Sequence, residues 1–209
     1  MPLYKTLVVN PDICIYLWKV EEQEAELAHP LKLTENSKQR LGGMKSELHR
    51  RGFLSIRHLL AEAGYRDSDL YYDELGKPHL QDGNHISITH SHTFTGIIVS
   101  KHIKVGIDIE KQRDKIARIA HKFTDLKHDR SSQDPELIRK LTVLWGAKES
   151  IYKILSIPGI SFYQHIDIKG VDLNKGNTRG VAYFERNKTE YHISFLEFEG
   201  FTCVYALCT

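Results

Sequence analysis

Apolar and polar residues recur with different spacings along the chain, and each spacing predicts a type of element. Residues 13–20 are mostly aromatic and β-branched, which is typical of a buried strand. In residues 34–63 the apolar positions recur at helical spacing, so we expect a long helical stretch. Glycine is a poor helix former, and we expect breaks at the Gly42-Gly43 pair and at Gly52.

The middle and the end of the chain carry more strand patterns. Residues 70–110 contain short β-rich pieces separated by glycine and polar residues, which predicts an antiparallel hairpin followed by another strand. Asp134 followed by Pro135 is a typical helix start, and we expect this helix to end near Leu155. Residues 191–207 alternate again and predict a final hairpin.

Two segments of the chain resemble each other. Residues 85–95 are HISITHSHTFT and residues 192–202 are HISFLEFEGFT, so His-Ile-Ser and Phe-Thr coincide at one constant offset. Strand, helix and hairpin follow in the same order around both segments, which favours duplication of an α+β unit. We therefore expect an α+β fold of two similar halves, residues 1–104 and 105–209. Interfaces between such halves often hold the ligand site.

The composition and the charge are those of an ordinary globular protein. Of the 209 residues, 41% are hydrophobic and 27% are charged, and the formal net charge is +2. This charge gives no reason to expect nucleic acid as a partner. No apolar stretch approaches the roughly 18 residues of a membrane span, so we expect no membrane association.

The cysteines and the first residues indicate a cellular compartment. Cys14, Cys203 and Cys208 are odd in number and lack metal-ligand spacing, which favours reduced thiols over a disulfide scaffold. The first residues lack the cationic and apolar parts of a secretory signal. We therefore expect a cytoplasmic protein.

Two segments place charged side chains where they could form a catalytic or metal-binding site. In residues 105–110 the apolar side chains face one side of the predicted strand, whereas Asp108 and Glu110 face the other. In the later helix, Glu149 and Lys153 are four residues apart and share one face. Three carboxylates suit Mg²⁺, which also takes water and phosphate oxygens. Each segment alone also has an ordinary interpretation, as a solvated strand face or as a helix ion pair.

Four motifs together make the chain similar to the 4′-phosphopantetheinyl transferases, specifically the long, surfactin-synthetase-activating type. Residues 106–110 are GIDIE and residues 145–153 are WGAKESIYK, which resemble the two central motifs of that family. Upstream, residues 76–78 (GKP) and 89–91 (THS) resemble its Gly-Lys-Pro and Ser-His-Ser motifs. Gly146 stands where the family usually has a hydroxyl residue.

The resemblance implies an activity and a catalytic site. The activity is transfer of 4′-phosphopantetheine from coenzyme A to a serine of an acyl or peptidyl carrier protein, which releases adenosine 3′,5′-bisphosphate. Mg²⁺, or Mn²⁺ in its place, would be held by Asp108, Glu110 and Glu149. Glu149 is the candidate base for the serine, and Lys153 would stabilise the phosphoryl group or assist proton transfer. The expected molecule is a monomer whose halves mimic a dimer.

The resemblance also implies coenzyme A contacts in the first half of the chain. Lys77 would contact the nucleotide end, while Thr89 and His90 belong to the motif that donates to a phosphate oxygen. Arg50 and Arg51 are the preferred candidates for the 3′-phosphate, because a guanidinium matches phosphate geometry. The other candidate cations in this region are Lys38, Arg40, Lys45 and Arg57, of which the last has a structural alternative among apolar neighbours.

Three other interpretations stay open. His85, His90 and His92 form a candidate zinc cluster, although no cysteine stands at a fixed spacing from them. A non-catalytic binder of coenzyme A or of a carrier protein would not need the intact carboxylates. A Mg²⁺-dependent phosphohydrolase would use the same carboxylates, but it leaves the upstream GKP and THS motifs unexplained.

Overall fold

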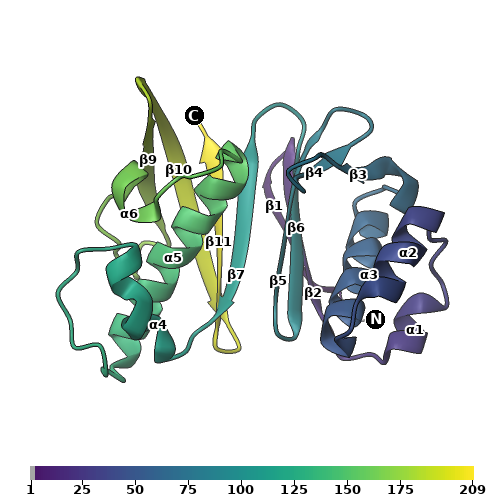
Figure 1. Cartoon of the computed structure of the whole chain (residues 1–209), viewed down its shortest axis with the longest axis horizontal. Coiled ribbons are helices and arrows are strands. Elements are labelled where there is room, and N and C mark those ends of the chain that lie inside the picture. Colours follow the sequence, from purple (N-terminus) through teal and green to yellow (C-terminus); the bar gives the residue numbers. More distant parts are fainter. Residues whose placement is uncertain (1–2) are drawn as a thin grey trace. The chain divides into compact units, whose positions relative to one another are not determined.

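The computed structural model describes residues 3–209 and mixes helices with antiparallel sheets, which confirms the α+β class (Figure 1). The chain divides into two compact units, Met1–His102 and Ile103–Thr209. The division falls two residues before the boundary expected from the sequence.

The first unit is built on a four-stranded sheet. Its strand order is β1 (Leu3–Asn10), β2 (Ile13–Lys19), β6 (Phe94–Ser100) and β5 (His85–Ser91). Helix α3 (Glu47–Glu62) packs on β2 and β6, and α1 (Glu24–Ala28) packs on α3. The remaining elements are α2 (Glu35–Gly43), the 3₁₀ turn η1 (Asp67–Asp69), and the strands β3 (Leu70–Tyr72) and β4 (Pro78–Leu80).

The predicted helical stretch in this unit is two helices. The chain leaves helical geometry between α2 and α3, just after the glycine pair, as expected. The expected break at Gly52 is wrong, because α3 continues through this residue. Gly52 is buried, and a Cβ atom there would lie 3.7 Å from the side chain of Thr95 on β6. Packing against the sheet therefore outweighs the low helix propensity of glycine.

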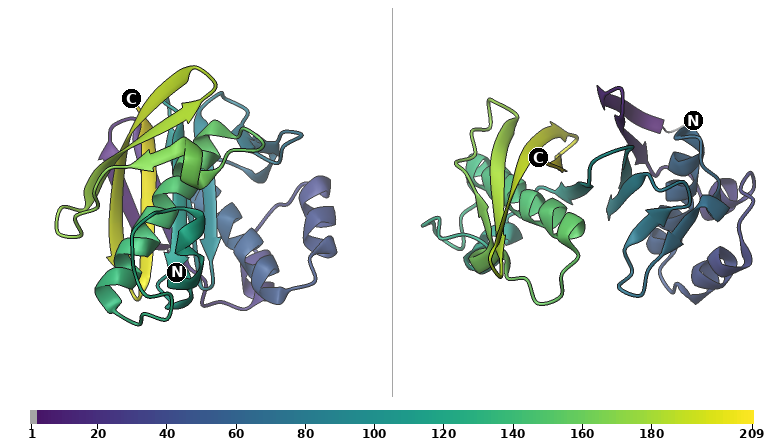
Figure 2. Two further views of the ribbon diagram at one scale, coloured as in Figure 1. Left: turned by 60° about the vertical axis from the view of Figure 1, so that its left-hand side comes forward. Right: turned by 90° about the horizontal axis from the view of Figure 1, so that it is seen from above.

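The second unit has a five-stranded sheet with a long helix on one face (Figure 2). The strand order is β7 (Val105–Lys111), β11 (Phe201–Cys208), β10 (Asn187–Phe198), β9 (Asn177–Phe184) and β8 (Ile166–Ile168). Helix α5 (Pro135–Leu155) packs mainly on β7 and β11. The short elements are α4 (Lys115–Ile119), the 3₁₀ turn η2 (Ala120–Lys122) and α6 (Phe162–His165).

Helix α5 begins and ends as the sequence predicts. The Asp134 carboxylate accepts a hydrogen bond from the backbone N–H of Glu136 at 3.0 Å, and Pro135 is the first helical residue. The helix ends at Leu155, because Ser156 adopts a left-handed conformation with φ of 51°. Its buried residues form the core of the second unit with β10 and β11.

The two repeated segments form hairpins with the same register. The end pair of β5 and β6 is His85 with Ser100, and the corresponding pair of β10 and β11 is His192 with Leu207. The turns also match, since His92 and Glu199 both have positive φ, 50° and 47°. These registers support duplication, and the pseudo-twofold relation of the two units stays a prediction.

Across residues 3–209, every helix is too short or too polar to span a membrane.

Candidate active site

Two glycines let α5 pack closely on β7, which carries Asp108 and Glu110, and on the neighbouring strand β11. A Cβ atom on Gly106 would lie 1.9 Å from the backbone oxygen of Ser150 on α5, so a side chain at position 106 would displace the helix. A Cβ atom on Gly146 would lie 2.8 Å from Cγ2 of Val204 and 3.6 Å from an oxygen of Asp108. The close packing brings one face of α5 beside the polar residues of β7.

Asp108 and Lys153 form an ion pair on this face, in which Asp108 is buried and Lys153 is partly buried. Nζ of Lys153 donates to Oδ1 of Asp108 at 2.8 Å and to the backbone oxygen of Ile107 at 2.7 Å. Asp108 is only 6% exposed. The polar side of β7 is therefore not a solvated strand face, and α5 covers it.

Glu149 and Glu110 lie partly buried beside this pair. Burial and the negative charge of Asp108 raise the pKa of Glu149 to about 7, with Lys153 acting against the rise. Burial and the charge of Asp108 also raise the pKa of Glu110, whereas a hydrogen bond with the Trp145 side chain lowers it. Each carboxylate therefore makes the ionised form of its neighbours less favourable, as expected where acidic groups lie close together.

The donor set fits a hard divalent cation in its chemistry. Three carboxylates that repel each other would be stabilised by a cation such as Mg²⁺, which prefers oxygen ligands. Within residues 3–209, no group of three or more His, Cys, Asp or Glu side chains is already placed so that it could hold a metal ion. Asp108, Glu110 and Glu149 as joint ligands therefore stay a prediction.

Lys148 belongs to the same sequence motif but has a structural role. Its Nζ donates to the backbone oxygens of Phe162 and Ile166, both at 2.6 Å, and the residue is 5% exposed. Burial lowers its pKa to about 8. Lys148 therefore ties α5 to α6 and β8.

A cavity of about 310 Å³ in the first unit contains His90, one of the predicted coenzyme A ligands. His49 of α3 lies opposite, with its ring centroid 6.1 Å from that of His90. Phe53 and Tyr72 supply aromatic lining. His49 was not among the predicted site residues, although its place one turn before Phe53 on α3 could have indicated it.

Arg57, although it also lines this cavity, is a structural residue. Its Nε donates to Oδ1 of Asp67 at 2.9 Å, and both side chains are 4% exposed. Hydrogen bonds from Thr34, Ser37 and Arg57 outweigh the effect of burial and lower the pKa of Asp67. This network joins α2, α3 and η1, which confirms the structural alternative for Arg57.

Arg50 and Arg51 differ in how the fold holds them. Nε of Arg50 lies 2.9 Å from both carboxylate oxygens of Glu24 on α1, and Nη1 donates to the backbone oxygen of Met44. Nη2 of Arg51 donates to the backbone oxygen of Val20 at 3.3 Å. Nε of Arg51 is buried and has no hydrogen-bond acceptor among the described residues. Arg51 therefore keeps more donor capacity for an anion than Arg50.

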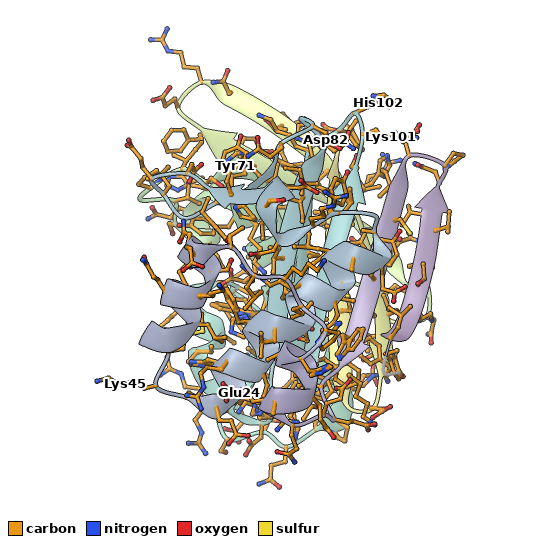
Figure 3. All side chains as sticks on the ribbon, turned by 90° about the vertical axis from the view of Figure 1, so that its right-hand side faces the viewer. Glu24, Lys45, Tyr71, Asp82, Lys101 and His102 are labelled. Carbon is orange, nitrogen blue, oxygen red and sulfur yellow. The ribbon has the colours of Figure 1, made fainter. Side chains whose placement is uncertain are left out.

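The remaining candidate cations have separate environments. Lys38 pairs with Glu35 at 2.6 Å, and the guanidinium of Arg40 lies 4.1 Å from the ring centre of Tyr72. Lys45 extends away from the helices (Figure 3).

Three further predicted residues lie on turns or in the sheet of the first unit. Lys77 follows Gly76 in the turn between β3 and β4, and its backbone N–H donates to Asp73 at 2.9 Å. Thr89 is 3% exposed on β5. His92, of the candidate zinc cluster, lies in the turn after β5, whereas His85 and His90 lie on the strand itself.

Comparison with known proteins adds a family. Residues 104–206 match the model of the 4′-phosphopantetheinyl transferase superfamily. The chain is 30% identical over 135 residues to the 4′-phosphopantetheinyl transferase gsp of Aneurinibacillus migulanus. The matched region covers 63% of this chain and 54% of that protein, so the chain spans about half the length of this relative.

Proposed function

Because residues 104–206 match the model of the 4′-phosphopantetheinyl transferase superfamily, we propose that the chain is a transferase of this kind. It would move 4′-phosphopantetheine from coenzyme A to a serine of an acyl or peptidyl carrier protein. The observation that carries the proposal is the cluster of Asp108, Glu149 and Lys153 on β7 and α5, in which Asp108 is buried and the other two are partly buried.

Catalysis of this reaction depends more on charge neutralisation than on covalent chemistry by the protein. The serine oxygen attacks the phosphorus next to pantetheine, the bond to the bridging oxygen breaks, and adenosine 3′,5′-bisphosphate leaves. Such transfers depend on positioning and on stabilisation of phosphoryl charge. Asp108, Glu110 and Glu149 would hold Mg²⁺, which when bound neutralises charge on the pyrophosphate oxygens. Mn²⁺ offers the same oxygen-binding chemistry.

Glu149 and Lys153 would handle the proton and the developing charge. Glu149 would accept the serine proton, directly or through a water. Lys153 has three N–H donors and uses two on Asp108 and Ile107. The third would donate to an oxygen of the transferring phosphoryl group.

The first unit would supply the coenzyme A contacts. His90 and His49 would offer imidazole donors to a phosphate, and Arg51 has a buried donor suited to an anion. Lys77, Thr89 and Arg50 stay predicted ligands.

The cellular setting is part of the proposal. Cys14, Cys203 and Cys208 are free thiols, which supports a reducing compartment such as the cytoplasm. A monomer without nucleic acid or membrane partners stays a prediction.

The test is a Mg²⁺-dependent assay with coenzyme A and a panel of apo carrier proteins. Mass gain on a carrier serine supports the proposal, and chelation of the divalent cation should stop it. Loss of coenzyme A without carrier modification would instead indicate a phosphohydrolase. Binding without either change would indicate a non-catalytic binder. Glu149→Gln, assayed beside the wild type, should lower the transfer rate.

A further inference from the structure

A row of polar side chains crosses the second sheet from Glu110. Glu110 on β7 is opposite Thr202 on β11, and Thr202 is opposite Glu197 on β10. Side chains directly opposite each other in antiparallel strands lie on the same face of the sheet. Helix α5 covers this face, because Trp145 hydrogen-bonds to the first carboxylate of the row and Arg139 to the last. The row therefore carries a further carboxylate, Glu197, that the proposed mechanism does not use.

Arg139 holds Glu197 in a forked ion pair. Nε of Arg139 lies 2.9 Å and 3.1 Å from the two carboxylate oxygens of Glu197, and Nη2 also donates to Oε2. The hydrogen bonding with Glu197 raises the pKa of Arg139. A guanidinium bound in this way neutralises the carboxylate and fixes its orientation. The oxygens of Glu197 are therefore available as fixed acceptors for a neighbouring donor.

Gln112 is that donor, and it connects Glu197 to the end of β7. Its side-chain Nε2 donates to Oε1 of Glu197 at 2.6 Å and to Oγ1 of Thr202 at 2.9 Å, which uses both N–H bonds of the amide. Its backbone N–H donates to the backbone oxygen of Gly200 at 2.8 Å. Gln112 is thus held at its side chain and at its backbone, two residues after Glu110.

The place of Glu110 in the sheet makes this anchor important. β7 is an edge strand of the five-stranded sheet, and β11 is the strand that pairs with it. Glu110 is the last residue but one of β7, and Lys111 opposite Phe201 is the last pair of the ladder. Strand ends open more easily than strand centres. The bonds of Gln112 close this end and limit the positions that the Glu110 carboxylate can take.

We propose that Gln112 is a positioning residue for Glu110, and that its network with Glu197 and Arg139 sets how tightly the site binds a divalent cation; this inference rests on the proposed function. The charge of Asp108 acts against ionised Glu110, so a loosened strand end would let the two carboxylates move apart. A cation would then have to bring them together again. Groups that orient metal ligands from behind typically contribute roughly ten- to a hundred-fold to metal affinity.

Gln112→Leu tests this proposal, with Gln133→Leu as the matched control. Leucine is close to glutamine in size but donates no hydrogen bond, and Gln133 is exposed in the loop before α5. Mg²⁺ is titrated into each protein without coenzyme A, by calorimetry and by tryptophan fluorescence, because Trp145 hydrogen-bonds to Glu110. Gln112→Leu should bind Mg²⁺ about tenfold more weakly than the wild type, and Gln133→Leu should bind it equally well.

Two further measurements separate positioning from catalysis and from stability. Glu197→Gln keeps an oxygen that accepts from Gln112, so it should also weaken Mg²⁺ binding, but by less than Gln112→Leu. In the transfer assay, Gln112→Leu should need about tenfold more Mg²⁺ for half-maximal rate and should regain the wild-type kcat at saturating Mg²⁺.

The outcomes distinguish this inference from the proposed function. If Gln112→Leu lowers the free energy of unfolding but binds Mg²⁺ as tightly as Gln133→Leu, the network is only structural and the inference is wrong, whereas the transferase proposal stands. A wild type that binds no Mg²⁺ would overturn both the inference and the proposed ligands. A protein whose Mg²⁺ binding depends on Gln112 but that modifies no carrier would overturn the transferase proposal and leave the positioning role standing.

Discussion

At the residue scale, the Asp108–Lys153 pair controls the charge of the proposed site. Asp108→Ala should abolish transfer, because it removes a proposed cation ligand and the partner of Lys153. Because Asp108 is buried, unfolding of this variant should also become easier by on the order of 1–3 kcal/mol. Urea unfolding and carrier mass measure the two effects. Near-normal transfer by a folded variant at saturating Mg²⁺ would show that Asp108 is not required.

Glu149 makes the stability of the protein depend on pH. Its pKa is raised from 4.5 to about 7 in the folded state, so the folded protein binds this proton more tightly than the unfolded chain. The stability that Glu149 contributes is therefore fully present at a pH below its pKa in the unfolded chain, and it is lost as the pH rises through about 7. Glu149→Gln should then be more stable than the wild type at pH ~8 without divalent cation, by on the order of 1–3 kcal/mol.

Thermal unfolding across pH checks this expectation. The difference between Glu149→Gln and the wild type should disappear at pH ~4, where both states of the wild type are protonated. Added Mg²⁺ should stabilise the wild type more than the variant, because it binds the folded carboxylates. Glu185→Gln, on an exposed turn, is the control and should show no such pH dependence. A constant offset at every pH would mean that Glu149 is not titrating as proposed.

At the element scale, the site depends on how closely α5 lies on β11. Gly146→Ala should destabilise the second unit by about 1–3 kcal/mol, because its Cβ atom would crowd Val204. Val204 is fully buried, so Val204→Ala alone should also destabilise the protein, through a cavity. The double variant should cost less than the two single variants added together, since each change relieves the other. Strictly additive unfolding free energies would contradict this contact.

Strong local signals made some elements predictable from the sequence. The Asp134-Pro135 start fixed α5 because capping and proline geometry act locally. Strand β1 was not predicted, because it lies at the sheet edge and its exposed residues, such as Val8 at 67%, lack a clear alternation. The break at Gly52 failed because burial against β6, a distant part of the chain, decided the conformation.

The candidate site likewise contains some residues that local spacing predicts and others that it does not. Asp108, Glu149 and Lys153 could be selected because spacing within one strand and one helix determines which side chains share a face. The cavity position of His49 depends on contacts between distant elements. The sequence contains no local pattern for such contacts.

At the scale of the whole molecule, the matched hairpins show which positions correspond in the two units. Asp108 pairs with Val204 on β11, and at the equivalent register of the first unit Tyr16 pairs with Ile97 on β6. Glu110 likewise corresponds to Trp18. At these two positions the second unit therefore has carboxylates, and the first unit has aromatic side chains. This difference favours chemistry in one unit and substrate binding in the other.

That division predicts separate kinetic effects for the two units. Arg50 and Arg51 are proposed to bind the 3′-phosphate of coenzyme A, which lies away from the reacting phosphorus. The contact exists in both the ground state and the transition state, so the Arg50→Ala, Arg51→Ala double variant should mainly raise KM. Glu149→Gln acts at the reacting group and should mainly lower kcat. A charge-assisted phosphate contact contributes on the order of 1.5–3 kcal/mol, or roughly ten- to a hundred-fold in affinity.

Dephospho-coenzyme A tests the arginines directly, because it lacks only the 3′-phosphate. The double variant should lose most of the wild-type preference for coenzyme A over dephospho-coenzyme A. Arg50 also pairs with Glu24, so Glu24→Gln controls for loosening of α1 and should keep that preference. Of the single variants, Arg51→Ala should lose more preference than Arg50→Ala, since Nε of Arg51 has no acceptor among the described residues. If the double variant keeps the full preference, other cations bind the 3′-phosphate, and Lys38 and Lys45 are the next candidates to replace.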